Sequence, residues 1–214
     1  MFGDVVQYLP GMFKGLLLDV FLSIVAMLLG AIAGMFIYLG KRSKNRFLHT
    51  VCAAYIEVIR NTPMLVQLYL IYFGLSQFGL DISAFFSMLI AMLLNNAGYS
   101  AEILRGGFLG VNPGLIEAGT ALGMKKWQIL LKIELIPALK NAFPSLINHF
   151  VTLFLFESVA ATIGLPGMTY ASMNAVAVSA RTLEIYVTTG VIYYLMTLVF
   201  VTLLRVMQKR IFKW

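Results

Sequence analysis

An apolar run at residues 13–39 is long enough to cross a lipid bilayer as a helix. The hydrocarbon core of a bilayer is roughly 30 Å thick, and a helix needs about 20 residues to span it. The rest of the chain has the same character, because 60% of its 214 residues are hydrophobic and only 12% are charged. A soluble domain has about half apolar and about a quarter charged residues. We therefore predict an all-α integral membrane protein in which residues 1–214 form one domain.

Further apolar stretches follow the first one, so the chain is expected to contain about five transmembrane helices. The second stretch is interrupted at Pro63, because proline removes a helical hydrogen bond and disfavours helix at the preceding residue, Thr62. Gly164, Pro166 and Gly167 predict a break in the chain before a short outer helix. The predicted spans cover residues 13–39, 47–78, 84–104, 138–161 and 185–206, and the short helix covers residues 168–178.

The first span carries two features that bear on its packing. Ala26, Gly30 and Gly34 are spaced four residues apart and form a stripe of small side chains, which allows a second helix to approach closely. Asp19 is unusual in an apolar span. We expect it near the outer end of the helix, where its carboxylate reaches headgroups or water.

Lysines and arginines are concentrated on one side of the predicted topology. Cytoplasmic loops carry an excess of these residues, so the N-terminus is expected outside and the C-terminus in the cytoplasm. The same asymmetry explains the net charge of +7, so we expect no nucleic-acid partner. We expect the chain to contact membrane lipid. Thirteen of the 16 cations lie on the cytoplasmic side: Lys41, Arg42, Lys44, Arg46, Arg105, Lys125, Lys126, Lys132, Lys140, Arg205, Lys209, Arg210 and Lys213.

The sequence contains none of the catalytic motifs that a membrane enzyme or an ATPase would need. A nucleotide-binding P-loop requires G-x-x-x-x-G-K-[ST], and the only Gly-Lys pair, Gly40-Lys41, lacks the remaining residues. H-E-x-x-H and G-x-S-x-G are also absent, and the single cysteine, Cys52, argues against a cysteine-based metal site. We therefore expect no enzymatic activity, no metal ion and no cofactor in this chain.

Three segments carry motifs of a known family. A basic segment at about 106–140 resembles the EAA loop of ABC-importer permeases, E-A-A-x-x-x-G, with Gly119 in place of the second alanine. The segment RNTPMLVQLYLIYFGL begins at Arg60, and GYSAEILRGGFLGVNPGLIEAG begins at Gly98; both resemble stretches of polar amino acid permeases of ABC importers. The residues that match the EAA motif are Glu117, Ala118, Gly119 and Gly123.

The EAA residues also have physical roles that their types suggest. Glu117 is expected near the start of a helix, where negative charge is favoured. Gly123 suits the left-handed residue that ends a helix. Ala118 and Gly119 are small, so the backbone of another chain can approach them closely.

The resemblance implies the permease subunit of a polar amino acid ABC importer, with the type I importer permease fold, in the bacterial inner membrane. It implies three kinds of partner: ABC ATPase subunits, a second permease subunit and an extracytoplasmic amino-acid-binding protein. ATP and Mg²⁺ would then bind to the ATPase, which docks on a short cytoplasmic helix of the EAA loop. The alternative is a secondary, ion-coupled amino acid transporter. Inverted repeats would be expected of such a protein, and none is evident across five spans.

Polar side chains within the predicted spans are candidates for the substrate path, because they are costly in hydrocarbon unless they are paired or hydrated. Amides can meet both ends of a zwitterion, and a carboxylate can attract an ammonium group or a cationic side chain. Glu157 can instead pair with a cation of the partner permease or open to periplasmic water. The candidates are Gln67, Asn95, Asn96, Glu157 and Ser158.

Two arginines each have two interpretations. Arg60 either lies near the cytoplasmic interface, contacting backbone or lipid phosphate, or forms an intramembrane ion pair with Glu57 on the same helix face. Arg105 pairs with Glu102, three residues earlier, and this pair is either a local surface contact or a clasp for the EAA loop.

Overall fold

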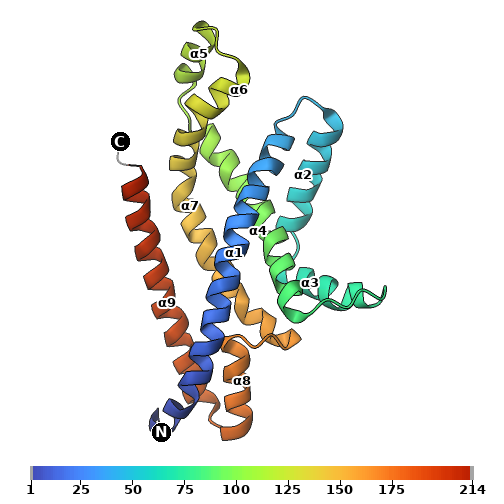
Figure 1. Cartoon of the computed structure of the whole chain (residues 1–214), viewed down its shortest axis with the longest axis vertical. Coiled ribbons are helices and arrows are strands. Elements are labelled where there is room, and N and C mark those ends of the chain that lie inside the picture. The colour runs from blue at the N-terminus through green and yellow to red at the C-terminus, as the bar shows by residue number, and fades with distance from the viewer. Residues whose placement is uncertain (1, 213–214) are drawn as a thin grey trace.

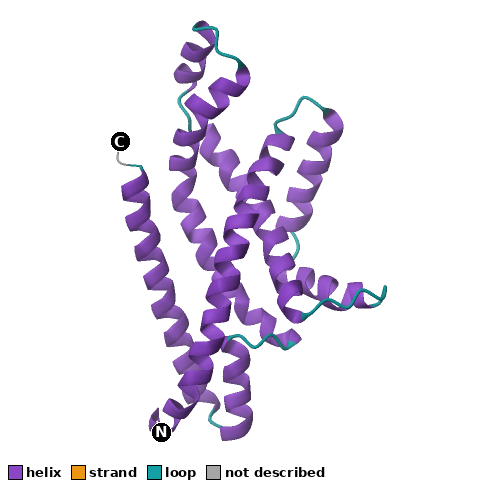
Figure 2. Cartoon of the chain, viewed as in Figure 1, coloured by secondary structure: helices purple, strands orange, loops and turns teal. Residues whose placement is uncertain are grey.

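Helices form all of the regular structure in the computed structural model, which describes residues 2–212 (Figures 1 and 2). No strand occurs in that part of the chain, so the all-α prediction is confirmed. Lys213, one of the predicted cytoplasmic cations, lies outside the described residues. The elements in chain order are η1 (Phe2–Tyr8), α1 (Leu9–Lys41), α2 (Arg46–Arg60), α3 (Met64–Tyr69), η2 (Leu70–Gly74), α4 (Ala84–Leu109), α5 (Pro113–Ala121), α6 (Lys126–Ile129), η3 (Leu130–Glu134), α7 (Leu135–Phe156), η4 (Glu157–Ile163), α8 (Met168–Ser179) and α9 (Thr182–Ile211).

Four continuous helical segments in the described chain are long and apolar enough to cross a membrane: Val5–Lys41, Ala84–Leu109, Lys126–Ile163 and Thr182–Ile211. The second predicted span is different. It is divided into α2 and the shorter apolar helix Met64–Gly74, and Pro63 lies at the division with an extended backbone. The prediction of about five helices therefore holds approximately, because proline breaks the second span where the sequence indicated.

The most extensive contact between two helices is that of α1 with α4, and the small-residue stripe allows the two backbones to approach closely. Ala26, Gly30 and Gly34 are all buried. A Cβ atom added to Gly30 would lie 2.5 Å from the amide nitrogen of Asn96, and one added to Gly34 would lie 2.7 Å from the Cβ of Ser100. Neither position therefore has room for a larger side chain, and the predicted role of the stripe in helix packing is confirmed.

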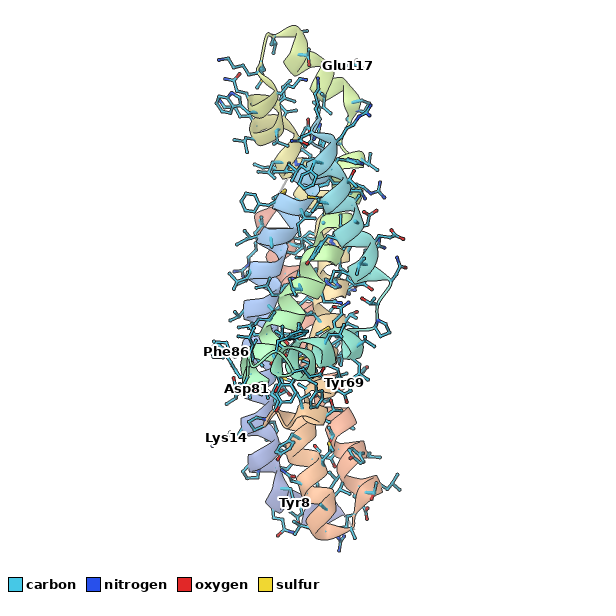
Figure 3. All side chains as sticks on the ribbon, turned by 90° about the vertical axis from the view of Figure 1, so that its right-hand side faces the viewer. Tyr8, Lys14, Tyr69, Asp81, Phe86 and Glu117 are labelled. Carbon is cyan, nitrogen blue, oxygen red and sulfur yellow. The ribbon has the colours of Figure 1, made fainter. Side chains whose placement is uncertain are left out.

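The two ends of the bundle carry different elements. One end carries α5, α6 and the loop between α1 and α2, while the opposite end carries the N-terminus and α8 (Figure 1). Figure 3 shows the same polarity, with Glu117 at one end and Tyr8 and Lys14 toward the other. The end with α5 and α6 is called the loop end below.

Asp19 corrects one sequence-based expectation. It does not reach headgroups or water, because its side chain is buried and its Oδ2 accepts a hydrogen bond of 3.0 Å from the backbone nitrogen of Met168. The hydroxyl of Tyr193 lies 3.4 Å from the same oxygen and donates to it. Gly15 and Gly167 permit this contact, since a side chain at either position would collide with the facing chain. Asp19 thus joins α1 to the start of α8, the predicted short helix, and to α9.

Candidate functional site: a cavity at the helix break and a capped helix at the loop end

The EAA motif forms a short helix with a defined start and end. Asn112 begins α5, and its Oδ1 accepts a hydrogen bond of 2.9 Å from the nitrogen of Gly114. Gly123 ends it with φ of +73°, the left-handed conformation that the sequence predicted. The nitrogen of Gly123 donates to the oxygen of Thr120 and that of Met124 donates to the oxygen of Gly119, which together satisfy two terminal carbonyls.

Two expectations for this helix need correction. Glu117 is the fifth residue of α5 rather than part of its first turn, because the helix starts earlier, at Pro113. Gly119 is buried inside the chain, where an added Cβ would lie 2.6 Å from the Cδ1 of Ile133 in η3. Its small size therefore serves packing within this chain, whereas Glu117 and Ala118 remain exposed.

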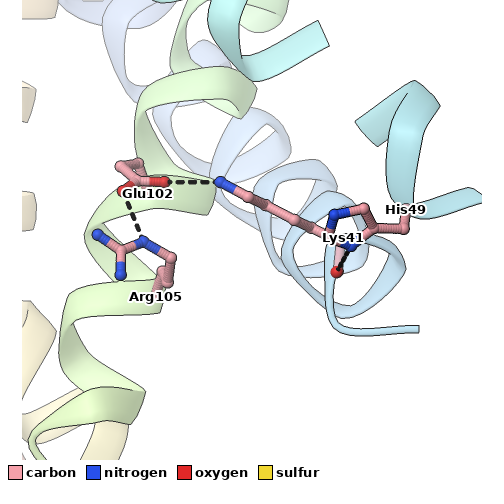
Figure 4. A network of polar contacts seen from close by, with 4 residues as sticks. All are labelled: Lys41, His49, Glu102 and Arg105. Carbon is pink, nitrogen blue, oxygen red and sulfur yellow. Dashed lines mark hydrogen bonds and ion pairs between the residues drawn. The ribbon is translucent and has the colours of Figure 1, made fainter. Parts of the chain in front are cut away.

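Ion pairs connect the loop end of α1 to the segments around α5. Arg42 donates two hydrogen bonds to Glu134, of 2.5 and 3.2 Å, and these bonds together with the Glu134 charge raise the pKa of Arg42 above its ordinary value. Lys41 and Arg105 both donate to Glu102, at 3.4 and 2.6 Å (Figure 4). The Glu102–Arg105 pair is thus part of a three-residue network that joins α1 to α4, rather than a local pair alone.

A cavity of ≈ 470 Å³ lies where the second span is broken. The turn around Pro63 forms one side of it, α4 contributes Asn95 and Tyr99, and Phe156 and Val159 close the other side. Its volume falls within the range of roughly 300–1,000 Å³ that is usual for small-molecule sites. The polar groups that face it come from the three residues preceding Pro63 and from Asn95 and Tyr99: Arg60, Asn61, Thr62, Asn95 and Tyr99.

Gln67 and Asn95, two of the predicted path residues, are in direct contact. The amide nitrogen of Gln67 donates to the oxygen of Ile59 at 2.9 Å and to the hydroxyl of Thr62 at 2.8 Å, so its orientation is held by the helix break. Its oxygen accepts a hydrogen bond of 3.1 Å from the amide of Asn95. The Oδ1 of Asn95 is buried and has no hydrogen-bond partner within residues 2–212, and Asn95 is one of the residues that line the cavity.

Arg60 lies on the cavity wall and does not pair with Glu57. The carboxylate of Glu57 accepts a hydrogen bond from Asn61 instead, at 2.9 Å. The Arg60 guanidinium lies 5.7 Å from the centre of the Tyr99 ring, and the His149 ring is stacked on Tyr99 with the ring centres 5.0 Å apart. Tyr99 was not among the predicted path residues, because an aromatic residue in an apolar span carries no local signal of what it faces.

Asn96 and Ser158 are placed away from the cavity. Asn96 donates to the backbone oxygens of Ala26 and Met27, both at 3.0 Å, and accepts a hydrogen bond from Ser100. It therefore joins α4 to α1. Ser158 donates to the oxygen of Leu155 in its own helical turn. The Asn96 amide and the Ser158 hydroxyl both bond within this chain, and neither residue lines the cavity.

Glu157 is buried and follows Phe156 in sequence, but it is not one of the residues that line the cavity. Neither of its carboxylate oxygens has a hydrogen-bond partner in the described part of the chain. The carboxyl of Asp19 and the hydroxyl of Ser23, both on α1, are close enough to interact with it. Two buried acidic groups, Asp19 and Glu157, thus lie close together, and Asp19 accepts hydrogen bonds from Met168 and Tyr193.

Comparison with known proteins identifies the family. The profile of the binding-protein-dependent transport system inner membrane component matches residues 26–213. The chain belongs to this family. As a member of the binding-protein-dependent transport family, it is a multi-pass membrane permease component, and the resemblance seen in its motifs is confirmed.

Relatives and solved structures agree with this assignment. The arginine transport system permease protein ArtQ of Bacillus subtilis is 29% identical, over 98% of this chain and 96% of its own length. The glutamine transport system permease protein GlnP of Escherichia coli is 30% identical, over 94% and 93%. The crystal structure of an amino acid ABC transporter with histidines is 37% identical, with a TM-score of 0.93 over 98% of both chains. The MetNI methionine transporter, at 19% identity and a TM-score of 0.72, shares the fold.

Proposed function

We propose that this chain is the permease subunit of an ATP-driven ABC importer, and that residues 1–214 act as one domain that forms the translocation path for a polar amino acid. The observation that carries the proposal is the cavity at the helix break. It is lined by Arg60 and by Asn95, whose buried amide oxygen has no hydrogen-bond partner in the described part of the chain. The names of the relatives, which include arginine and glutamine permeases, support an amino acid as the substrate class.

The chemistry of the cavity suits a zwitterion. Arginine binds carboxylates with paired hydrogen bonds, so Arg60 is the candidate for the α-carboxylate. The oxygen of Asn95 is an acceptor for the α-ammonium group, and Gln67 holds that amide in position. Glu157, which is buried and next in sequence to Phe156 of the cavity lining, is the candidate for a cationic group of the substrate.

We assign coupling to α5. Its exposed residues Glu117 and Ala118 are available to a separate ATPase subunit. Gly119 allows α5 to pack closely on η3, and Gly123 ends the helix. ATP and Mg²⁺ would bind to that partner. A helix that transmits movement must be rigidly attached to the bundle, and the Arg42–Glu134 pair beside it supports such attachment.

The proposed orientation follows from charge. With the loop end in the cytoplasm, the cations of the α1–α2 loop and of the segment around α6 obey the positive-inside rule. The N-terminus and α8 then face outward, where an amino-acid-binding protein would deliver substrate. A second permease subunit completes the path, and the exposed apolar side chains of α9 are suited to contact with that subunit or with lipid.

Reconstitution tests this function. The chain is assembled with its ATPase and binding protein in proteoliposomes, and uptake is measured with a panel of radiolabelled amino acids. ATP-dependent uptake of one or a few polar amino acids, together with substrate-stimulated ATP hydrolysis, is the expected result. Uptake driven by a sodium or proton gradient without the ATPase would instead establish the ion-coupled alternative.

A further inference from the structure

A second hollow, of ≈ 610 Å³, lies at the loop end between the end of α1 and the segment that contains α5, α6 and η3. It is separate from the cavity at the helix break, and no residue lines both. Three cationic side chains face it, Arg42, Lys44 and Lys126, against a single carboxylate, that of Glu134. The hollow therefore has a net charge of two positive units, which favours an anionic ligand.

The two lysines are available for such a ligand. Arg42 and Glu134 are already committed to each other through two hydrogen bonds. The amino groups of Lys44 and Lys126 take part in no ion pair or hydrogen bond with the rest of residues 2–212. Both side chains are exposed at the rim, so each can turn toward a bound anion without breaking an existing contact.

The apolar side chains around the hollow indicate a lipid rather than a soluble anion. Leu39 and Ile129 form part of its floor, and Trp127, on its edge, is 55% exposed. Leu131, one helical turn after Trp127, is 51% exposed, so an apolar face continues beside the cations. Tryptophan is enriched where a membrane meets water, and lysines extend their charged ends from such a face toward headgroups.

We propose that this hollow binds the phosphate-bearing headgroup of an anionic phospholipid. Lys44 and Lys126 contact the phosphate, and Trp127 lies along the part of the acyl chains that is next to the headgroup. Under the orientation proposed above, the lipid belongs to the cytoplasmic leaflet, where basic pockets between helices are suited to anionic headgroups. Because the hollow adjoins α5, a lipid bound there lies against the proposed coupling helix.

The chain provides its own reporter for a test. It has two tryptophans, Trp127 and Trp214, so Trp214→Phe leaves Trp127 as the only one. The full chain in detergent is titrated with phosphatidylglycerol or phosphatidylcholine that carries brominated acyl chains, and quenching of Trp127 is followed. Phosphatidylglycerol is expected to quench at a lower mole fraction, by about fivefold for each lysine that contacts the phosphate.

Matched variants separate a specific site from general charge attraction. Lys44→Gln with Lys126→Gln should bring the two lipids to the same quenching curve, whereas Lys209→Gln, on the C-terminal turn of α9, should leave the preference intact. Circular dichroism and gel filtration confirm that the double variant is folded. An unchanged preference in the double variant, or an equal loss in the Lys209 variant, overturns the proposal.

Two further experiments test whether a soluble anion or the ATPase occupies the hollow instead of lipid. Inorganic phosphate, compared with chloride at equal ionic strength, should not abolish the phosphatidylglycerol preference. If phosphate alone abolishes it, the hollow is a site for soluble anions and the lipid assignment is wrong. The titration is repeated on the chain assembled with its ATPase, where the preference should persist. Its disappearance there would mean that the ATPase covers the hollow, which also overturns the proposal.

Discussion

Arg42 and Glu134 are joined by two hydrogen bonds although 92 residues separate them in sequence. Arg42 follows the last residue of α1, and Glu134 ends η3, the segment on which Gly119 of α5 packs. The side chain of Glu134 is almost fully buried, whereas about half of the Arg42 side chain is exposed. This pair is a direct polar connection between the end of α1 and η3, on which the proposed coupling helix α5 packs.

Removal of one partner should destabilise the protein. Arg42→Ala leaves the buried carboxylate of Glu134 without its cation, which costs roughly 3–5 kcal/mol when a pair is fully buried. Since Arg42 is half exposed and water can replace part of its contact, we expect about 1–2 kcal/mol. Thermal unfolding in detergent should show a lower Tm, and Arg42→Glu with Glu134→Arg should recover part of it. If the charge-reversed protein melts no higher than Arg42→Glu alone, the pair does not act as described.

Gly123 should tolerate asparagine and not valine. Gly123 has a left-handed backbone conformation, which costs a non-glycine residue roughly 1–2 kcal/mol. A β-branched side chain adds further strain in this conformation, whereas asparagine adopts it more readily. We expect Gly123→Val to abolish substrate-stimulated ATP hydrolysis in the assembled transporter while the subunit stays in the membrane. Gly123→Asn is the control and should retain stimulation. Full stimulation in the valine variant would remove the coupling role of this helix end.

Asn95 should determine substrate affinity. Asn95→Leu removes the unpaired amide oxygen and the hydrogen bond that Asn95 donates to Gln67, and it retains a similar volume. A hydrogen bond to a charged group contributes about 1.5–3 kcal/mol, so the KM for uptake should rise by roughly 10- to 150-fold. Ser158→Ala is the control, because Ser158 bonds only within its own helical turn and should leave the KM unchanged. Equal KM values in both variants would place the substrate elsewhere.

Glu157 is tested by a change that retains shape and removes charge. If its carboxylate attracts a cationic group of the substrate, Glu157→Gln should reduce uptake at low substrate concentration, while basal ATP hydrolysis and assembly persist. Unchanged uptake would exclude Glu157 from the site. Loss of the permease dimer would indicate that the buried charge of Glu157 supports assembly rather than substrate binding.

The orientation of the chain can be measured by cysteine labelling. After Cys52→Ala, single cysteines are introduced at Lys44, in the α1–α2 loop, and at Val178, an exposed residue near the end of α8. An impermeant maleimide added to intact cells should label position 178 and not position 44, and inside-out vesicles should give the reverse. Labelling of position 44 from outside would invert the topology.

Features that depend on neighbouring residues were predictable. The apolar length of α1, the interruption at Pro63 and the left-handed conformation of Gly123 all depend on hydropathy or backbone preference within a few residues. The stripe of Ala26, Gly30 and Gly34 was predictable for the same reason, although its partner helix was not. The family motifs are also continuous stretches of sequence.

Features that depend on distant residues were not predictable. Asn95 and Asn96 are adjacent, and the sequence provides no basis for ranking them. Successive side chains on a helix point about 100° apart, so the amide of Asn95 bonds to Gln67 while that of Asn96 bonds to α1. Asp19 was expected in contact with headgroups or water, but the glycines at 15 and 167 bring the start of α8 to it across 149 residues of chain. Hydropathy and spacing describe one helix at a time, whereas the partner of a buried polar group depends on which helices pack together and how closely their backbones approach.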